Sequence, residues 1–236
     1  MPANSALDYL WHMGELRLFA IGIDELRDLF SAAEPVARDF RRLAASHFPP
    51  PEPPRSPGLL GKLGPLFKRP PDAPVVRPGV PTEQEIAAIV SGRFIPPERL
   101  SAAWLLVETW LEHRSWGHHG IVADEDRFTD LEFDLARVGV PARFGLAKLL
   151  NRELGVPLRP CPGLLVGYVQ HSHAVAIRDC WQSGLMGLSI ENRAIAEPYV
   201  SWLAHFQEWA AQATAAYRPI PDLVALLRAE VTAPAG

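Results

Sequence analysis

Histidines are the residues of this sequence whose type and spacing could support chemistry. Five of the eight lie in two clusters, EHRSWGHHG with His113, His118 and His119, and QHSH with His171 and His173. If residues 170–174 are extended, the last two side chains point to one face and could supply two ligands to a divalent metal such as zinc. A third ligand could come from the turn after the long helix predicted from Pro96, among His118, His119, Asp124 and Glu112. Three protein ligands with an open position for water would make a metal-dependent enzyme or a small-molecule binder.

The same histidines also fit an interpretation without a metal. Two histidines separated by one residue are a weak signal, and the sequence does not fix the distance between the two clusters. His118 and His119 follow a predicted helix, where a cation interacts favourably with the helix C-terminus. On this interpretation the histidines are surface or hydrogen-bonded residues, and the protein has no cofactor.

Other enzyme signatures are absent from the sequence. There is no GxxxxGK[ST], GxGxxG or GxSxG motif and no CxxC or HExxH zinc pattern. Cys180 could be a nucleophile paired with a histidine, but Asp179-Cys180-Trp181 does not resemble a nucleophile turn, so we expect a structural thiol. The run Asp124-Glu125-Asp126 lacks the glycine and distal glutamate of an EF-hand loop, which indicates a solvated turn.

Aromatic residues are the second candidate feature, because the chain has seven tryptophans. Helical spacing places Trp202, Phe206 and Trp209 along one stripe and Trp104 and Trp110 along another. Stripes of this kind usually form core. The alternative is a groove for a partner or ligand, bounded by the two helices that carry them.

Helices dominate the elements that must position these side chains. Apolar spacing and capping residues predict helices from Asp24, from Pro35, at 82–92 behind the capping box Thr82–Glu85, from Pro96, at 130–138, at 143–154 and from Glu197 toward Tyr217. Residues 222–229 are predicted to add a last helical turn or two. Short strands are predicted at 15–21, 164–169 and 174–177. The predicted fold class is therefore mainly α (α+β), a helical domain with a small sheet of short strands.

Twelve of the 24 prolines fall between Pro49 and Pro81. This stretch cannot hold a helix or a central strand, so residues 49–81 are predicted to form a Pro-rich linker or long loop, with a formal charge of +3. The 48 residues before it are too few for a separate core. We therefore expect one domain over 1–236, with 82–236 as the helical body and 1–48 packed on it.

Charge and hydropathy exclude several classes of protein. The net charge of −4 gives no basic footprint for nucleic acid. Apolar runs do not exceed six residues, for example 18–23, so no transmembrane helix is expected. The first residues do not follow the pattern of a signal peptide, which favours a cytoplasmic protein with Cys161 and Cys180 as reduced thiols.

Three segments resemble an uncharacterised family of small actinobacterial proteins, a domain of unknown function. They are LRLFAIGIDELRDLF, EIAAIVSG followed by PPERLSAAWLLVETWLEH, and FQEWAAQATAAYRPIPDLVALL. The resemblance implies a short strand and helix, a helix ending in glycine, a long helix and a late helix with tryptophan. It implies no activity, and the insert at 49–81 departs from its compact pattern.

Two hypotheses about function follow from the sequence. The first is a non-enzymatic protein-interaction module, for instance of immunity or inhibitor type, which fits the acidic balance, the aromatic content and the lack of enzyme signatures. The alternative is the metal-dependent enzyme or small-molecule binder described above. The sequence does not determine the oligomeric state.

Overall fold

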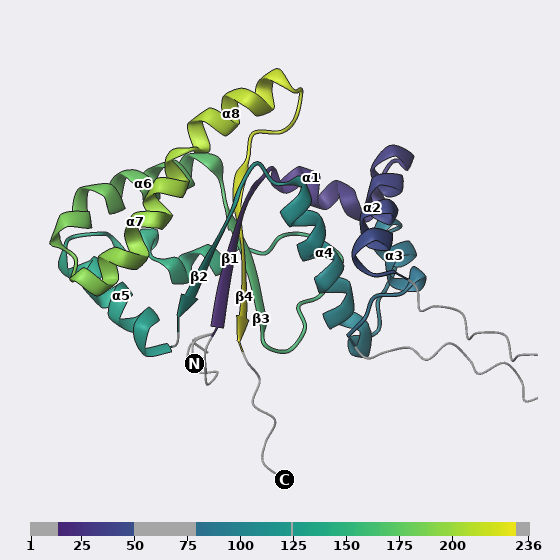
Figure 1. Cartoon of the computed structure of the whole chain (residues 1–236), viewed down its shortest axis with the longest axis horizontal. Coiled ribbons are helices and arrows are strands. Elements are labelled where there is room, and N and C mark those ends of the chain that lie inside the picture. The colour runs from purple at the N-terminus through teal and green to yellow at the C-terminus, as the bar shows by residue number, and fades with distance from the viewer. Residues whose placement is uncertain (1–13, 50–78, 124, 230–236) are drawn as a thin grey trace, which may run out of the picture.

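A four-stranded antiparallel sheet lies at the centre of the protein (Figure 1). The computed structural model describes residues 14–49, 79–123 and 125–229. The strands are β1 (Gly14–Ile21), β2 (His118–Ala123), β3 (Leu164–Val169) and β4 (Asp222–Ala229), and their order across the sheet is β2-β1-β4-β3. Helices cover both faces, so the architecture has three layers.

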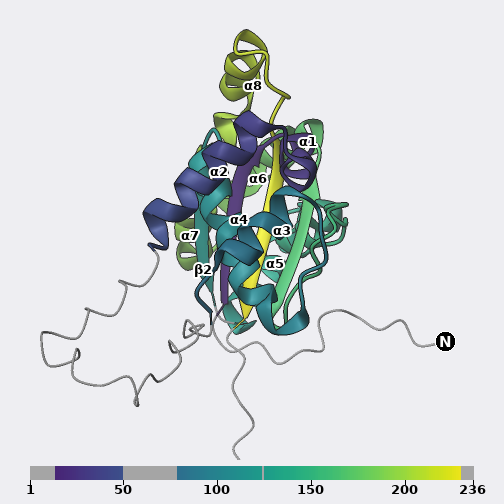
Figure 2. The same cartoon turned by 90° about the vertical axis from the view of Figure 1, so that its right-hand side faces the viewer.

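The first helical layer comes from the N-terminal half of the chain. It contains α1 (Ile23–Asp28), the 3-10 turn η1 (Leu29–Ser31), α2 (Glu34–His47), α3 (Glu83–Val90), the 3-10 turn η4 (Pro97–Arg99) and α4 (Leu100–Arg114). Figure 2 looks onto this layer, in which α4 lies against the sheet and α2 and α3 pack on α4. The helix α4 is buried around most of its circumference, as expected of the wide apolar stripe in its sequence.

The second layer covers the opposite face of the sheet. It contains α5 (Glu125–Arg137), the 3-10 segments η5 (Ala142–Phe144), η6 (Leu146–Leu150) and η7 (Leu185–Gly187), and the helices α6 (His171–Gly184), α7 (Ile190–Ala204) and α8 (Phe206–Ala215). Side chains alternate along each strand, so every central strand needs apolar residues on both faces. In β1, Phe19 and Ile21 enter the core of the first layer, whereas Leu16 and Leu18 enter the core of the second.

Several predictions from the sequence are confirmed. The fold is mainly α with a small antiparallel sheet. The strands predicted at 15–21 and 164–169 are β1 and β3, and the helix predicted from Pro35 is α2. The capping box is present, because the Thr82 side chain accepts from the backbone of α3 while Glu85 accepts from Thr82 N–H at 2.7 Å. No helix of the described residues is long and apolar enough to cross a membrane.

Several secondary-structure predictions are wrong. Residues 222–229 form β4, a strand in the middle of the sheet, instead of a helical end. Residues 174–177 belong to α6 and are not a strand. The helix predicted from Glu197 to Tyr217 is two helices, α7 and α8, and Pro198 lies inside α7 instead of at its start. Residues 143–154 contain short 3-10 segments and no α-helix.

The two helices that follow β1 and β3 share one cap. Asp24 does not cap α1 as predicted; the N-cap of α1 is Gly22, which has no side chain to accept from the helix. The carboxylate of Asp222 at the start of β4 accepts instead, from Ile23 N–H at 3.1 Å and from His171 N–H at 2.9 Å. One carboxylate therefore stabilises the N-termini of α1 and α6 on opposite faces of the sheet.

The predicted linker at 49–81 lies almost entirely outside the described residues.

Candidate protein-binding edge

The histidines predicted as metal ligands do not converge. His171 and His173 lie in the first turn of α6. Side chains two residues apart on a helix point about 200° from each other. Residues 171–174 are therefore helical and not extended, so the condition for two ligands on one face is not met. His171 Nδ1 lies 3.1 Å from the carbonyl oxygen of Pro221, and His173 Nε2 lies 3.2 Å from that of Arg143. Each ring is held by a different backbone group.

His118 and His119 are neighbours on β2, so their side chains point to opposite faces of the sheet. His118 is exposed, whereas His119 lies against Tyr199 and Trp202 at ring-centroid distances of 6.1 and 5.9 Å. Asp124 lies outside the described residues. Within the described ranges, no three His, Cys, Asp or Glu side chains form a group that could hold a metal. The metal hypothesis therefore loses the convergence on which it depended.

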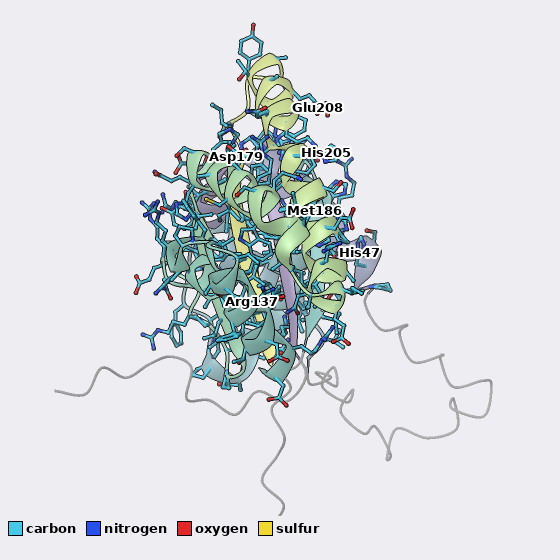
Figure 3. All side chains as sticks on the ribbon, turned by 90° about the vertical axis from the view of Figure 1, so that its left-hand side faces the viewer. His47, Arg137, Asp179, Met186, His205 and Glu208 are labelled. Carbon is cyan, nitrogen blue, oxygen red and sulfur yellow. The ribbon has the colours of Figure 1, made fainter. Side chains whose placement is uncertain are left out.

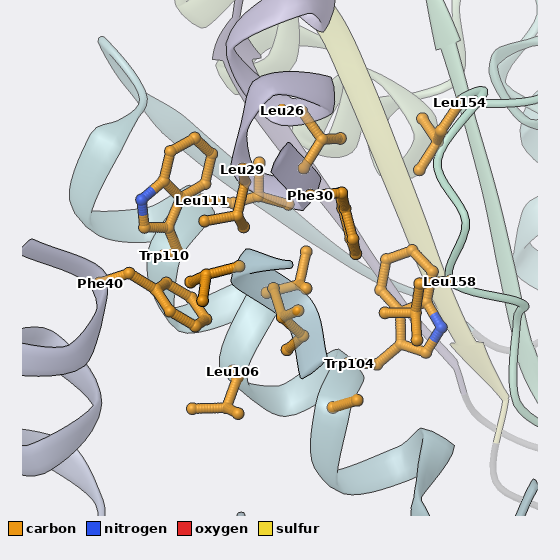
Figure 4. Packing of buried hydrophobic residues seen from close by; sticks show 14 of the residues in the cluster. Leu26, Leu29, Phe30, Phe40, Trp104, Leu106, Trp110, Leu111, Leu154 and Leu158 are labelled. Carbon is orange, nitrogen blue, oxygen red and sulfur yellow. The ribbon is translucent and has the colours of Figure 1, made fainter. Parts of the chain in front are cut away.

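The two aromatic stripes lie on opposite sides of the sheet. Trp104 and Trp110 are buried in the core of the first layer, where Figure 4 shows them among leucine and phenylalanine side chains. Trp202 and Phe206 are buried in the second layer. The five residues therefore do not line one groove, and Trp104 and Trp110 are core.

Only Trp209 of these aromatic residues reaches the surface, together with its neighbour His205. Trp209 is half-buried at the edge of the second layer, and its ring lies 5.7 Å from that of Trp202 and 5.4 Å from that of His205. Figure 3 shows His205 on the outer side of the layer, where α7 meets α8. A Cβ atom placed on Gly117 would lie 2.5 Å from the Trp209 ring, so this ring packs directly on the backbone that leads into β2.

Strand β2 pairs with β1 on one side only, because it stands at the edge of the sheet. Its start is a bulge: Ala20 N–H donates to the Gly117 carbonyl at 2.9 Å, and the Ala20 carbonyl accepts from Trp116 N–H at 2.9 Å. With the observed register, His119 and Ile121 direct their backbone groups toward β1. The backbone groups of the alternate residues His118, Gly120 and Val122 therefore point away from the sheet.

These three alternate residues are all exposed to solvent. Gly120 has no side chain, so its exposure is exposure of the backbone itself. Val122 is 67% exposed, a large value for an aliphatic side chain in a strand. The opposite edge differs, because no residue of β3 is classed as exposed. Natural sheet edges are usually protected by charges, by proline or by a covering element, and HHGIVA contains no lysine, arginine, aspartate, glutamate or proline.

The inward face of β2 is fixed by the second layer. Ile121 is buried, and the His119 ring is partly buried, which lowers its pKa, so it is neutral at neutral pH. Burial also raises the pKa of the Tyr199 hydroxyl, with a contribution from the nearby Glu132, so the aromatic group behind β2 carries no charge. The strand is therefore held rigidly on one face while its outer edge stays open.

The remaining nucleophilic candidates have structural surroundings. Cys161 and Cys180 are both free thiols, in agreement with the prediction of reduced cysteines. Cys161 is buried, and burial raises the pKa of its thiol. Cys180 is half-buried on α6. Arg178, two residues before it, forms an ion pair with Asp179. Neither residue has the activated environment of a nucleophile.

Comparison with known proteins adds no relative. No protein-family model matches the chain, and neither a curated protein nor a solved structure matches it at a significant level. The resemblance of the three sequence segments to an actinobacterial family therefore stays a prediction.

Sequence reasoning missed β2. The sequence places His118 and His119 in a turn at the end of the helix predicted from Pro96, where a cation interacts favourably with the helix C-terminus, whereas the structure places them on β2. The signal for a strand was present but short: Ile121 and Val122 are the only β-branched residues in the segment. The position of this strand at the edge of the sheet could not be predicted from residues 118–123, because the order of all four strands determines which strand is at the edge.

Proposed function

We propose that this protein is a protein-binding module that takes an extended segment of its partner onto the outer edge of β2. The observation that carries the proposal is the exposed row His118, Gly120 and Val122, which contains no lysine, arginine, aspartate or glutamate and whose backbone groups are directed away from the sheet. An extended peptide added to such an edge gains main-chain hydrogen bonds at every second residue. This mode of binding needs no catalytic group, and it agrees with the lack of enzyme signatures.

Side chains next to the edge suggest what the partner segment contains. In the observed register, Val122 stands opposite Glu15 and Gly120 opposite Arg17, and both β1 side chains are partly exposed on the same face. At the other end of β2, the half-buried Trp209 ring packs beside the bulge at Gly117. A partner strand with an apolar residue on the first-layer face would pack along Val122, and an apolar residue on its opposite face, near the bulge, would reach the Trp209 ring of the second layer. A module of immunity or inhibitor type, as expected from the sequence, would bind its partner in this way without catalysis.

The first experiment measures the edge itself. Backbone amide exchange by NMR is expected to show fast exchange at His118, Gly120 and Val122 and slow exchange at His119 and Ile121. Slow exchange at all five amides in the purified protein would show that another part of the chain already covers the edge, and it would overturn the proposal.

The second experiment blocks the edge and follows a partner. Val122→Lys places a charge on the exposed edge, and Gly120→Pro removes an outward N–H, both of which discourage strand addition while leaving the ladder to β1 intact. Phe94→Lys is the matched control, because Phe94 is 72% exposed and follows α3, which packs on α2, α4 and η1. A protein captured from the source cells by the wild type should be reduced at least tenfold by both edge variants and unchanged by the control. Equal capture by all four proteins would contradict the proposal.

A further inference from the structure

A basic surface cleft of about 260 Å³ lies where β3 ends and α6 begins. Three cations line it: Arg143 from η5, Lys148 from η6 and Arg152 from the turn that follows. No aspartate or glutamate is among the described residues that line it. The chain as a whole has a net charge of −4, so this local excess of positive charge runs against its composition.

Arg143, Lys148 and Arg152 form no ion pair within the described part of the chain, although most other described arginines do. Glu132 interacts electrostatically with Lys148 but forms no ion pair with it, and its carboxylate accepts from the backbone N–H of Ala147 at 3.2 Å. Burial of Glu132 raises the pKa of its carboxyl, which disfavours the charged form that would attract Lys148.

Both arginines are positioned by aromatic rings. The Arg152 guanidinium lies 4.5 Å from the centre of the Tyr168 ring, and the Arg143 guanidinium lies 4.7 Å from that of Phe144. Both rings are buried and therefore fixed. A cation held over a ring keeps its N–H groups free at the rim of the guanidinium, where they can bind oxygen atoms in pairs. The arginines are thus oriented without using their donors.

Amide groups complete the walls of the cleft. Asn151 and Gln170 contribute side-chain amides. His173 also lines the cleft, and its Nε2 atom lies 3.2 Å from the carbonyl oxygen of Arg143. Gln170 is also the N-cap of the 14-residue helix α6, and its side chain does not cap the helix. The positive end of the helix dipole therefore adds to the field in the cleft, reduced by the Asp222 carboxylate that accepts from His171 N–H.

We propose that this cleft binds the phosphoryl group of a small molecule. Three unpaired cations with amide donors and no acid match a group that carries two negative charges and several acceptor oxygens. The volume is below the 300–1,000 Å³ typical of sites for drug-sized ligands, so it suits one phosphoryl-bearing end of a molecule and not a whole dinucleotide. The site is separate from the proposed protein-binding edge, because β3 and β2 form opposite edges of the sheet.

NMR titration with inorganic phosphate and with pyrophosphate, at low salt, tests the proposal. Saturable shifts are expected at amides of residues 143–152 and 168–173, and stronger binding of pyrophosphate than of acetate, which carries a single charge. Arg143→Ala with Arg152→Ala should weaken binding at least about tenfold. Arg38→Ala on the exposed face of α2 should leave it unchanged.

Two further measurements keep the result decisive. If the double variant fails to fold, Lys148→Ala replaces an exposed side chain and should still weaken binding severalfold. Shifts that do not saturate, or that are equal in the wild type and in the folded variants, would show non-specific attraction and overturn the proposal. The behaviour of Val122→Lys separates this site from the protein-binding edge, since that variant should bind pyrophosphate normally.

Discussion

Asp222 is the residue whose removal should test the architecture most directly. Its carboxylate accepts from Ile23 N–H and His171 N–H, the first residues of α1 and α6. Neither helix has another side-chain cap, because Gly22 has no side chain and the Gln170 side chain does not accept from α6. Asp222→Ala therefore leaves both helices without a cap in a single step.

The expected loss follows from the cost of one cap. Removing an N-cap side chain costs about 1 kcal/mol, so the loss of both is expected to lower the free energy of unfolding by about 2 kcal/mol. In a chain of this size that corresponds to a fall in Tm of about 4–8 °C. Asp222→Asn keeps one acceptor oxygen and should lose about half as much.

Urea unfolding followed by circular dichroism measures these losses, with the slope checked for constancy between variants. Asp28→Ala is the control, because Asp28 is an exposed residue of α1 whose side chain makes no hydrogen bond with a described residue. It should leave the stability unchanged. A loss below about 0.5 kcal/mol for Asp222→Ala, or an equal loss for Asp28→Ala, would refute the shared cap.

Two further predictions concern stability. Hydrogen bonds, first of all from Ser189 N–H, lower the pKa of the buried Asp134 carboxyl from 3.8 to about 2, so its charged form stabilises the fold above pH 4. As the pH falls from about 4 to about 2, the free energy of unfolding of the wild type should decrease by about 2 kcal/mol more than that of Asp134→Asn, measured by urea titration at each pH. Equal pH dependence of the two proteins would contradict this. Gly92→Ala should cost about 1–3 kcal/mol, since Gly92 has φ 61° and a new Cβ would collide with the Phe30 carbonyl oxygen. Gly79→Ala, at φ 79° with no atom within 4 Å, should lose less, and an equal loss would remove the collision as the cause.

Local signals were sufficient where one element determines its own structure. The capping box at Thr82 and the glycine stop at Gly92 depend only on residues within a few positions, and α3 begins and ends accordingly. The apolar spacing after Pro35 likewise predicted the helix that is α2. Such features are decided by backbone hydrogen bonds inside the element, so the sequence alone predicts them.

Residues 222–229 show where local signals fail. The segment DLVALLRA is rich in leucine and alanine, which favour a helix. It becomes a strand because it is enclosed by β1 and β3 and by helical layers on both faces, so apolar side chains are needed on both sides of the backbone. The uninterrupted apolar run Leu223–Leu227 is typical of such a strand, but the same run also fits a buried helix. Only the partners of the segment decide between the two.

The candidate sites depend on the same long-range choices. Insertion of β4 between β1 and β3 leaves β2 at one edge of the sheet and β3 at the other. The chain then places η6 beside β3, where a Cβ atom on Gly167 would lie 2.6 Å from the Leu150 backbone, and this contact brings Lys148 and Arg152 to the cleft. No described element covers the outer side of β2 in the same way, and its alternate residues remain exposed. The central position of β4 thus produces both the open edge and the basic cleft, and a residue pattern that does not reveal that position cannot predict either one.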